Sequence, residues 1–279
     1  MVDLDKIKEK AQSEAVGINL VLKEYIHFLV LEYFFKAGYF SHLVFQGGTT
    51  LRFAYGGIRY SEDLDFVLRQ KDNKFLDSLI EGMNHLPGHI DKFLPFARNV
   101  QLKIQKDTLE FKRFILVMEI ETMVAKDKTH IEILNIPSYD NRIMIIRRGD
   151  IPISPAITVE SPEELLSDKF TALGSREYLK GRDIWDIYFL LDTLKVSLTN
   201  NILKMVQKKI IDYHTDYKEF SLRFKNSIDL LREKGSYILK QEMDKFLPVF
   251  YRKSFEGNYK NISQKVLNAS LWVKDEIRL

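Results

Sequence analysis

Two aspartates separated by one residue are well suited to metal chemistry. Asp63 and Asp65 follow a loop with two adjacent glycines, at residues 56–57. In a β-strand, residues i and i+2 point to the same side, so both carboxylates would share one face while Leu64 and Phe66 enter the core. Adjacent carboxylates repel each other unless a cation lies between them, and hard oxygen ligands suit Mg²⁺. The spacing therefore predicts a site for Mg²⁺ or Mn²⁺.

A glycine turn precedes these aspartates. The apolar stretch 42–45 predicts a short strand, Gln46-Gly47-Gly48 a tight turn, and 49–55 a helix that begins on Thr49 as its cap. The first turn of a helix carries backbone N–H groups without partners, and the helix dipole adds to their attraction for an anion. A single Asp-x-Asp is usually a solvated strand face, and a double glycine is usually only a turn. Together they predict a cradle for a triphosphate.

A two-metal site normally contains a third carboxylate, and three glutamates are candidates for this ligand. Glu132 lies between two isoleucines on the predicted strand 129–136, so it should face away from the core. Glu119 and Glu121 on the preceding strand are rivals. Metal ions bridging the phosphates would favour in-line attack by a hydroxyl on the α-phosphorus, with pyrophosphate leaving. Glu132 is the preferred third ligand.

The surrounding pattern predicts an α+β domain. Helical periodicity covers 3–35 with an interruption near Gly17, and a helix at 75–83 should end at Leu86-Pro87-Gly88. Strands are expected at 63–68, 100–105, 111–122 and 129–136, the last two forming a hairpin across the turn at 125–128.

A helical domain should follow. The Pro-bearing stretch 151–155 precedes Ser161-Pro162-Glu163-Glu164, where Ser caps a helix and Pro occupies its first position. From there the periodicity is helical, with breaks expected near glycines 174, 181, 235 and 257. We predict a bilobal α+β fold, with a mixed sheet and flanking helices in residues 1–158 and an α-helical domain in residues 159–279.

The composition limits the cellular compartments and the kinds of catalytic group that we expect for this protein. Of the 279 residues 45% are hydrophobic, enough for a sizeable core, and the net charge is only +3. From Lys195 onward, 17 Lys and Arg face 10 Asp and Glu, so the basic residues concentrate in the tail. The absence of cysteine excludes disulfides, thiolate metal sites and cysteine nucleophiles. Without an apolar leader or a long uncharged stretch, we expect a cytoplasmic protein with no membrane association.

Other motifs are absent or weak. The glycines near Gly47 match neither the P-loop nor the dinucleotide pattern. His85 and His89 bracket a Pro-Gly pair, which we expect to form a loop rather than the single helical face that a zinc pair needs.

Two segments carry a family resemblance. Residues 45–52, Phe-Gln-Gly-Gly-Thr-Thr-Leu-Arg, and residues 59–66, Arg-Tyr-Ser-Glu-Asp-Leu-Asp-Phe, resemble the AbiEii/AbiGii toxin family of nucleotidyltransferases, within the DNA polymerase β-like superfamily. Residues 165–173 and 182–187 look like its later helical motif of Lys, Arg-Asp and a further Asp. The resemblance covers roughly residues 40–190 and implies a bilobal fold that binds a nucleotide in its cleft.

The resemblance also implies roles for individual residues. Asp63 and Asp65 would bind metal, and Ser61 would support the phosphate or metal site. The nucleotide would be contacted by Gly47, Gly48, Thr49, Arg52, Ser61 and Lys169. Asp183 and Asp186, one helical turn apart beside Arg182, would act near the substrate hydroxyl, and which of them is essential stays open. Outside the family, these three residues would more often form a surface ion-pair cluster.

The implied activity is Mg²⁺-dependent transfer of NMP from an NTP to a hydroxyl, with tRNA or another RNA as acceptor and an antitoxin protein as restraint. Transfer to a protein or small molecule, and an inactive nucleotide-binding module, are the alternatives. The basic and aromatic tail could hold RNA through Lys208, Lys209, Tyr213, Tyr217, Arg223, Lys225, Tyr251, Arg252 and Lys253. Such residues also commonly form a solvated helical face with core aromatics.

Overall fold

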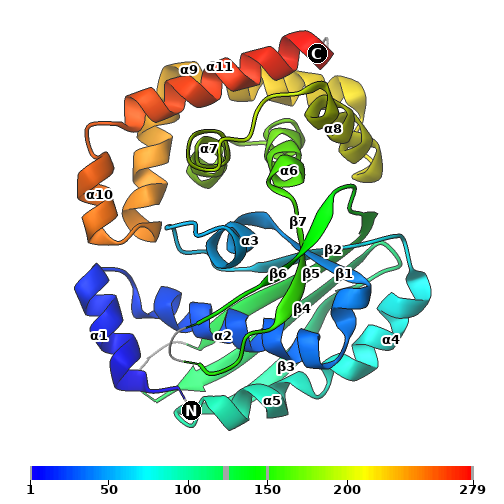
Figure 1. Cartoon of the computed structure of the whole chain (residues 1–279), viewed down its shortest axis with the longest axis vertical. Coiled ribbons are helices and arrows are strands. Elements are labelled where there is room, and N and C mark those ends of the chain that lie inside the picture. Colours follow the sequence, from blue (N-terminus) through cyan, green and yellow to red (C-terminus); the bar gives the residue numbers. More distant parts are fainter. Residues whose placement is uncertain (1, 122–125, 149–150, 278–279) are drawn as a thin grey trace. The chain divides into compact units, whose positions relative to one another are not determined.

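The computed structural model describes residues 2–121, 126–148 and 151–277. They divide into two compact units, Met1–Val159 and Glu160–Leu279. The first contains a seven-stranded sheet with helices, and the second is helical (Figure 1). The α+β class predicted from the sequence is confirmed. None of the described helices combines the length and apolar character that crossing a membrane requires.

The first unit contains the sheet elements. Its helices are α1 (Leu4–Glu14), α2 (Ile18–Lys36), η1 (Tyr39–Ser41), α3 (Gly47–Ala54), α4 (Asn73–Met83) and α5 (Leu86–Phe93). Its strands are β1 (Leu43–Gln46), β2 (Leu64–Leu68), β3 (Ala97–Asp107), β4 (Phe111–Ile120), β5 (Asp127–Pro137), β6 (Asn141–Ile145) and β7 (Ala156–Glu160), whose last residue belongs to the second unit.

The sheet has the strand order β3-β4-β5-β2-β1-β7-β6. β1 is antiparallel to β2 and parallel to β7, while β2 is parallel to β5. The predicted β4–β5 hairpin is present as an antiparallel pair. Along β4, Phe114, Leu116 and Met118 are fully buried, whereas Arg113, which precedes them, and Ile115, which lies between the first two, are partly exposed. One face of this sheet region therefore packs into the core.

Several local predictions in this unit were wrong. α3 begins at Gly47 rather than on a Thr49 cap, because Thr49 is buried inside the helix. Leu86-Pro87-Gly88 starts α5 instead of ending a helix, since Pro is tolerated in the first helical turn. His89 consequently lies in a helix, where its Nε2 is 2.6 Å from Glu32 Oε2.

The prediction also missed two strands and misplaced strand ends. β6 and β7 lie on either side of the Pro-bearing stretch, for which the sequence predicts only a boundary between domains. Asp63 directly precedes β2, which begins at Leu64. Asp127 and Lys128 belong to β5 rather than to the predicted turn at 125–128, and Ala125 and Thr122 lie outside the described residues.

The second unit consists of helices. They are α6 (Pro162–Ser175), α7 (Gly181–Tyr188), η2 (Phe189–Thr193), α8 (Asn200–Asp212), α9 (Tyr217–Phe246), α10 (Val249–Phe255) and α11 (Tyr259–Ile277). The predicted Ser161 cap is confirmed, since its hydroxyl accepts from the Glu164 N–H at 3.0 Å.

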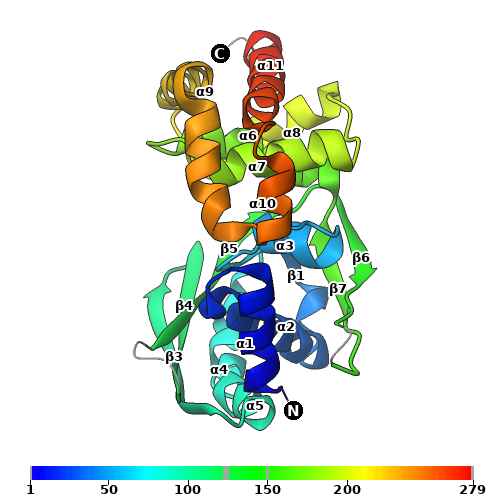
Figure 2. The ribbon, with the colours of Figure 1, turned by 90° about the vertical axis from the view of Figure 1, so that its left-hand side faces the viewer.

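Of the glycines expected to break helices, Gly235 lies in the middle of α9. The break expected near Gly174 is confirmed, because α6 ends at Ser175. A Cβ at Gly174 would lie 2.3 Å from the ring of Phe220, and one at Gly235 would lie 2.2 Å from Ser263 Oγ. Gly235 belongs to α9 and Ser263 to α11, two helices that pack against each other (Figure 2). These glycines therefore permit close helix packing.

Candidate active site

The turn between β1 and α3 lies against Asp65. Gln46 is the Cα partner of Asp65 in the ladder between β1 and β2. Gly47 follows with φ +80°, a conformation that favours glycine, and a Cβ there would lie 2.7 Å from Asp65 Oδ2. Because α3 starts at Gly47, a carboxylate lies directly beside the N-terminus of that helix.

An arginine packs against the second glycine of this turn. A Cβ at Gly48 would lie 2.0 Å from Arg59 Nη2, so glycine leaves the space that the guanidinium fills. Arg59 is only 4% exposed, and its Nη1 donates to the Tyr60 carbonyl at 3.0 Å. The sequence motif included Arg59, but its residue type alone gave no reason to assign it a role. Its charge lies beside the helix N-terminus, where an anion would be attracted.

Three hydrogen bonds hold the segment that leads to the aspartates. Thr49 Oγ1 donates to the Asp63 carbonyl at 2.5 Å, and the Tyr60 hydroxyl donates to Glu14 Oε2 at 2.7 Å. His27 Nε2 lies 3.1 Å from the Glu62 carbonyl. Burial lowers the pKa of His27 to about 4, so its ring is neutral near pH 7 and its Nε2–H is the donor. The buried helix α2 thus fixes the backbone next to Asp63.

His130 on β5 contacts the side chain of Asp63. Nδ1 of the imidazole lies 3.1 Å from Asp63 Oδ1, and an ionised carboxylate can only accept, so the ring donates. Both side chains are partly exposed, at 34% for His130 and 41% for Asp63. Sequence reasoning missed this role, although His130 and Glu132 are two residues apart and so share a strand face.

Strand register places Glu132 next to Asp65. The two are Cα partners in the parallel pair of β2 and β5, and Arg113 is the partner of Glu132 on β4. Arg113 Nε donates to Glu132 Oε1 at 2.8 Å, so the glutamate is already in an ion pair. A metal would have to compete with that guanidinium.

The rival glutamates lie further along the sheet. Glu119 is six residues from Arg113 on β4, about 20 Å at the usual strand rise, and Glu121 is further still. Glu119 pairs with Lys126 at 2.7 Å, and Glu121 contacts Arg98. Register therefore favours Glu132 over both rivals, while its role as a metal ligand stays a prediction.

The carboxylates present fit a metal that is completed by substrate. Within residues 2–121, 126–148 and 151–277, no group of three or more His, Asp or Glu side chains could hold a metal ion by itself. Mg²⁺ commonly binds through one or two carboxylates plus substrate phosphates and water. Asp63 and Asp65 supply oxygen donors of that kind, and no thiolate competes, since the chain lacks cysteine.

Arg52 and Ser61 lie close to this turn in the sequence. Arg52 Nε donates to Glu24 Oε1 at 2.6 Å, its Nη1 donates to the Ile58 carbonyl at 2.8 Å, and the guanidinium lies over the Tyr60 ring. Burial would raise the pKa of Glu24, but Arg52 and neighbouring cations lower it to about 2. Arg52 thus holds the loop before the aspartates. Ser61 is half-buried in that loop, and nucleotide contact by either residue stays a prediction.

The helical unit gathers the other predicted site residues. Lys169 Nζ on α6 lies 3.2 Å from Asp183 Oδ1 and 2.8 Å from Asp186 Oδ2, both on α7. The aspartates are 2% and 1% exposed, so this is a buried cluster rather than a surface one. Burial would raise the pKa of Asp183, but Lys169 and Arg176 lower it. The lysine ammonium is thereby held in a fixed position.

Arg182 contacts a carboxylate and an aromatic ring on α9. Its Nε lies 3.3 Å from Glu242 Oε2, and its guanidinium packs over Phe246. Glu242 also accepts from the backbone N–H groups of Gly181 and Arg182, at 3.0 and 3.1 Å, and so caps α7. Arg176 contacts Asp183 in the cluster around Lys169.

One residue of the expected RNA-binding tail is misassigned. Lys209 is fully buried, and its Nζ lies 3.2 Å from Glu160, 2.9 Å from Glu164 and 2.7 Å from Asp168. It therefore cannot contact an RNA backbone on the surface. The periodicity of α8 could have indicated this, because Met205, Val206 and Ile210 on the same helix are buried too.

Solved structures resemble the chain over most of its length. JHP933 from Helicobacter pylori is 16% identical with a TM-score of 0.55, covering 94% of this chain and 95% of its own. A second Helicobacter pylori protein, described as a "putative nucleotidyltransferase", is 16% identical with a TM-score of 0.54, covering 94% and 98%. No curated protein matches the sequence. The fold is thus of the nucleotidyltransferase class.

Family membership follows from the sequence. The family "Nucleotidyl transferase AbiEii toxin, Type IV TA system" matches residues 29–266, a range that extends into both units. The chain belongs to this family.

Proposed function

We propose that the protein transfers a nucleoside monophosphate from an NTP to a hydroxyl acceptor. The observation that supports this most is the contact of Asp65 with Gly47 at the start of α3. A metal-binding carboxylate there adjoins backbone N–H groups that attract phosphate. Such an arrangement can bind a metal and a triphosphate together, and membership of the AbiEii family supports the same activity.

Each site residue has a distinct task in this proposal. Mg²⁺ bound at Asp63 and Asp65, with Glu132 as the proposed third ligand, would neutralise charge on the phosphates. Backbone N–H groups at Gly47, Gly48 and Thr49 would hold the triphosphate.

Other side chains position the site or contact the substrate. Arg59 adds positive charge at the turn, and His130 orients Asp63 through its hydrogen bond. Ser61 and Lys169 would contact phosphate, while Asp183 and Asp186 hold the Lys169 ammonium in place.

The proposed acceptor is RNA, with tRNA as the first candidate. The family description names a type IV toxin–antitoxin system, so a cognate antitoxin is part of the proposal. RNA offers terminal hydroxyls, and nucleotidyl addition to them would explain a toxic effect.

An α-phosphorus-labelled NTP supplied with Mg²⁺ tests the activity and the acceptor together. The protein is incubated with total RNA, with protein and with a small-molecule extract, beside Asp65→Asn and the exposed-residue control Asp91→Asn. We expect label in RNA with wild type and Asp91→Asn but not with Asp65→Asn. Label found only in protein or only in small molecules would show that this class, and not RNA, is the acceptor. No label in any fraction would contradict the proposed nucleotidyl transfer.

A further inference from the structure

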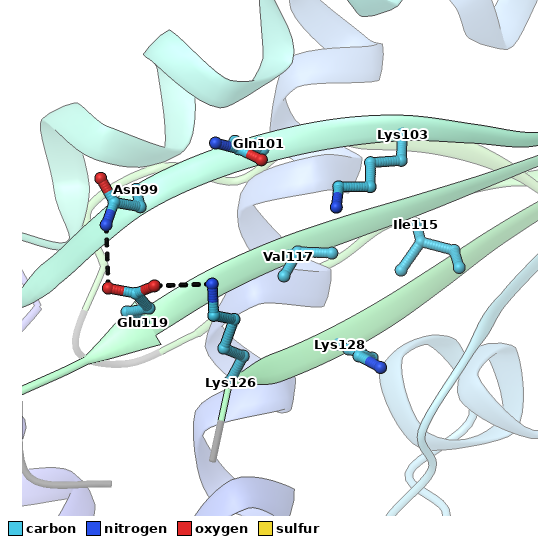
Figure 3. A pocket seen from close by; sticks show the side chains of 8 residues that line it. All are labelled: Asn99, Gln101, Lys103, Ile115, Val117, Glu119, Lys126 and Lys128. Carbon is cyan, nitrogen blue, oxygen red and sulfur yellow. Dashed lines mark hydrogen bonds and ion pairs between the residues drawn. The ribbon is translucent and has the colours of Figure 1, made fainter. Parts of the chain in front are cut away.

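A hollow lies on the sheet away from the two aspartates. It measures about 510 Å³, within the usual range for ligand pockets, and opens on β3, β4 and β5. Figure 3 shows the side chains around it, which are Asn99, Gln101, Lys103, Ile115, Val117, Glu119, Lys126 and Lys128. Neither Asp63 nor Asp65 lines it.

Strand register connects this hollow to the candidate active site. Val117 and Lys128 are Cα partners, as are Ile115 and His130, and Arg113 and Glu132. Side chains two residues apart share a face, so the hollow lies on the same sheet face as His130 and Glu132. Lys128 is four residues from Glu132, about 13 Å along the strand. A chain-like acceptor reaching Asp65 could therefore also cover the hollow.

The charges in the hollow favour an anion. Glu119 is neutralised within it, because Lys126 lies 2.7 Å away and Asn99 Nδ2 donates at 2.8 Å (Figure 3). Lys103 and Lys128 are exposed, and among the described residues no carboxylate lies within ion-pair distance of either. Two ammonium groups are thus left to bind phosphate.

The rest of the lining suits a nucleic acid. Ile115 and Val117 form an apolar surface at its centre, and the amides of Asn99 and Gln101 lie beside them. Apolar side chains can pack against the face of a base or a ribose, and amide groups can hydrogen-bond to base edges or hydroxyls. A single nucleic-acid strand combines these groups with regularly spaced phosphates.

We propose that this face of β3, β4 and β5 holds the acceptor RNA strand, with Lys103 and Lys128 binding its phosphates while its terminal hydroxyl reaches Asp65. The assignment rests on the proposed function, because it takes RNA as the acceptor. It places acceptor binding on the sheet rather than on the basic tail that the sequence suggested.

Fluorescence anisotropy with a labelled single-stranded RNA, measured without NTP, tests the surface directly. The variant Lys103→Ala/Lys128→Ala is compared with Lys71→Ala/Lys74→Ala, which removes the same charge from exposed positions outside the hollow. We expect the first variant to bind RNA about tenfold more weakly, and the slope of log K against log salt to shrink by about 1.4. Unchanged affinity and slope, or equal losses in both variants, would overturn the assignment.

Transfer kinetics separate this inference from the proposed function. If both hold, Lys103→Ala/Lys128→Ala raises KM for RNA about tenfold and leaves KM for NTP unchanged. If this variant transfers to RNA with an unchanged KM, the proposed function stands and the RNA-binding surface is wrong. If RNA binding depends on the two lysines but no transfer occurs, the RNA-binding surface stands and the proposed function is wrong. If Lys103→Ala/Lys128→Ala kept its RNA affinity but lost binding to an acidic protein, the two lysines would bind that protein rather than RNA. This result would also overturn the assignment.

Discussion

At the residue scale, the site depends on groups that hold the two aspartates in place. Asp63 receives a hydrogen bond from His130, its carbonyl accepts one from Thr49, and Asp65 lies against Gly47. Groups that orient metal ligands commonly influence affinity strongly although they do not touch the metal. His130 is the clearest example here.

Replacing His130 should weaken metal binding without unfolding the protein. In His130→Ala the Asp63 carboxylate loses its donor, so we expect the Mg²⁺ concentration for half-maximal transfer to rise about 10-fold to 100-fold. His85→Ala, at an exposed position, is the control and should behave as wild type. A Mg²⁺ dependence unchanged in His130→Ala would show that the hydrogen bond has no role in metal binding.

His27 should make stability depend on pH. Its pKa falls from 6.5 in the unfolded chain to about 4 on burial, so below pH 6.5 the unfolded state binds a proton that the folded state does not. Stability from this group is therefore present above 6.5 and is lost as pH falls toward about 4, by on the order of 3 kcal/mol. Urea unfolding of His27→Gln should show a weaker pH dependence over this range. An unchanged pH profile would mean that His27 is not buried as a neutral ring.

At the element scale, the buried residue Lys209 connects α8 with the first half of α6 through ion pairs. Lys209 faces Glu160, the last residue of β7, and Glu164 and Asp168, which lie one turn apart on α6. Burial and the neighbouring Asp168 raise the pKa of Glu160 well above its usual range. Burial opposes charge on Lys209 too, but the three carboxylates raise its pKa well above normal.

Removing this lysine should destabilise the helical unit in a pH-dependent manner. Lys209→Met leaves three carboxyl groups without their counterion, so we expect a loss of about 3–5 kcal/mol in the free energy of unfolding. The loss should be smaller at about pH 5 than at about pH 8, because protonated carboxyls need no counterion. Lys208→Met, at the exposed neighbouring position, should cost little. If chemical denaturation gave equal free energies of unfolding for Lys209→Met and wild type, the result would contradict the buried cluster.

Local sequence signals predicted elements well where a few adjacent residues decide the structure. The Ser161 cap, the strand before Gly47 and the β4–β5 hairpin each follow from short-range patterns. β6 and β7 were missed because a proline stretch lies between them and their pairing depends on distant strands, such as Phe45 with Val159. The break predicted near Gly235 is wrong, since this glycine lies inside α9 and packs closely on Ser263 of α11, a contact that no local pattern reveals.

The candidate site, like the fold, could be predicted from the sequence only where local patterns decide it. Strand periodicity placed Glu132 on an outward face, but only the register of β2 with β5 shows it beside Asp65. The roles of Arg59 and His130 depend on contacts across the sheet and across the glycine turn. Side chains brought together by long-range pairing could not be identified from one sequence.

At the scale of the whole molecule, the predicted site residues are divided between the two units. The family match extends into both, and the predicted residues form one group around Asp63 and Asp65 and another around Lys169. In the proposed function the first group would bind metal and the second would contact phosphate, so the two should contribute separately.

Lys169→Ala should therefore separate metal binding from transfer. We expect the transfer rate to fall about 100-fold to 1000-fold, as for loss of a group that stabilises developing charge, while Mn²⁺ affinity stays near that of wild type. Lys240→Ala, an exposed lysine of α9, is the matched control. Full activity in Lys169→Ala would exclude the lysine from the reaction.

Mn²⁺ titration by electron paramagnetic resonance, with a non-hydrolysable NTP present, tests the central claim most directly. Wild type, Asp63→Asn, Asp65→Asn and the exposed-residue control Asp91→Asn are compared. If the two aspartates hold the metal, wild type and Asp91→Asn bind nucleotide-dependent Mn²⁺, while each of the other variants binds it at least about tenfold more weakly. Equal affinity in all four proteins would contradict a metal site at Asp63 and Asp65.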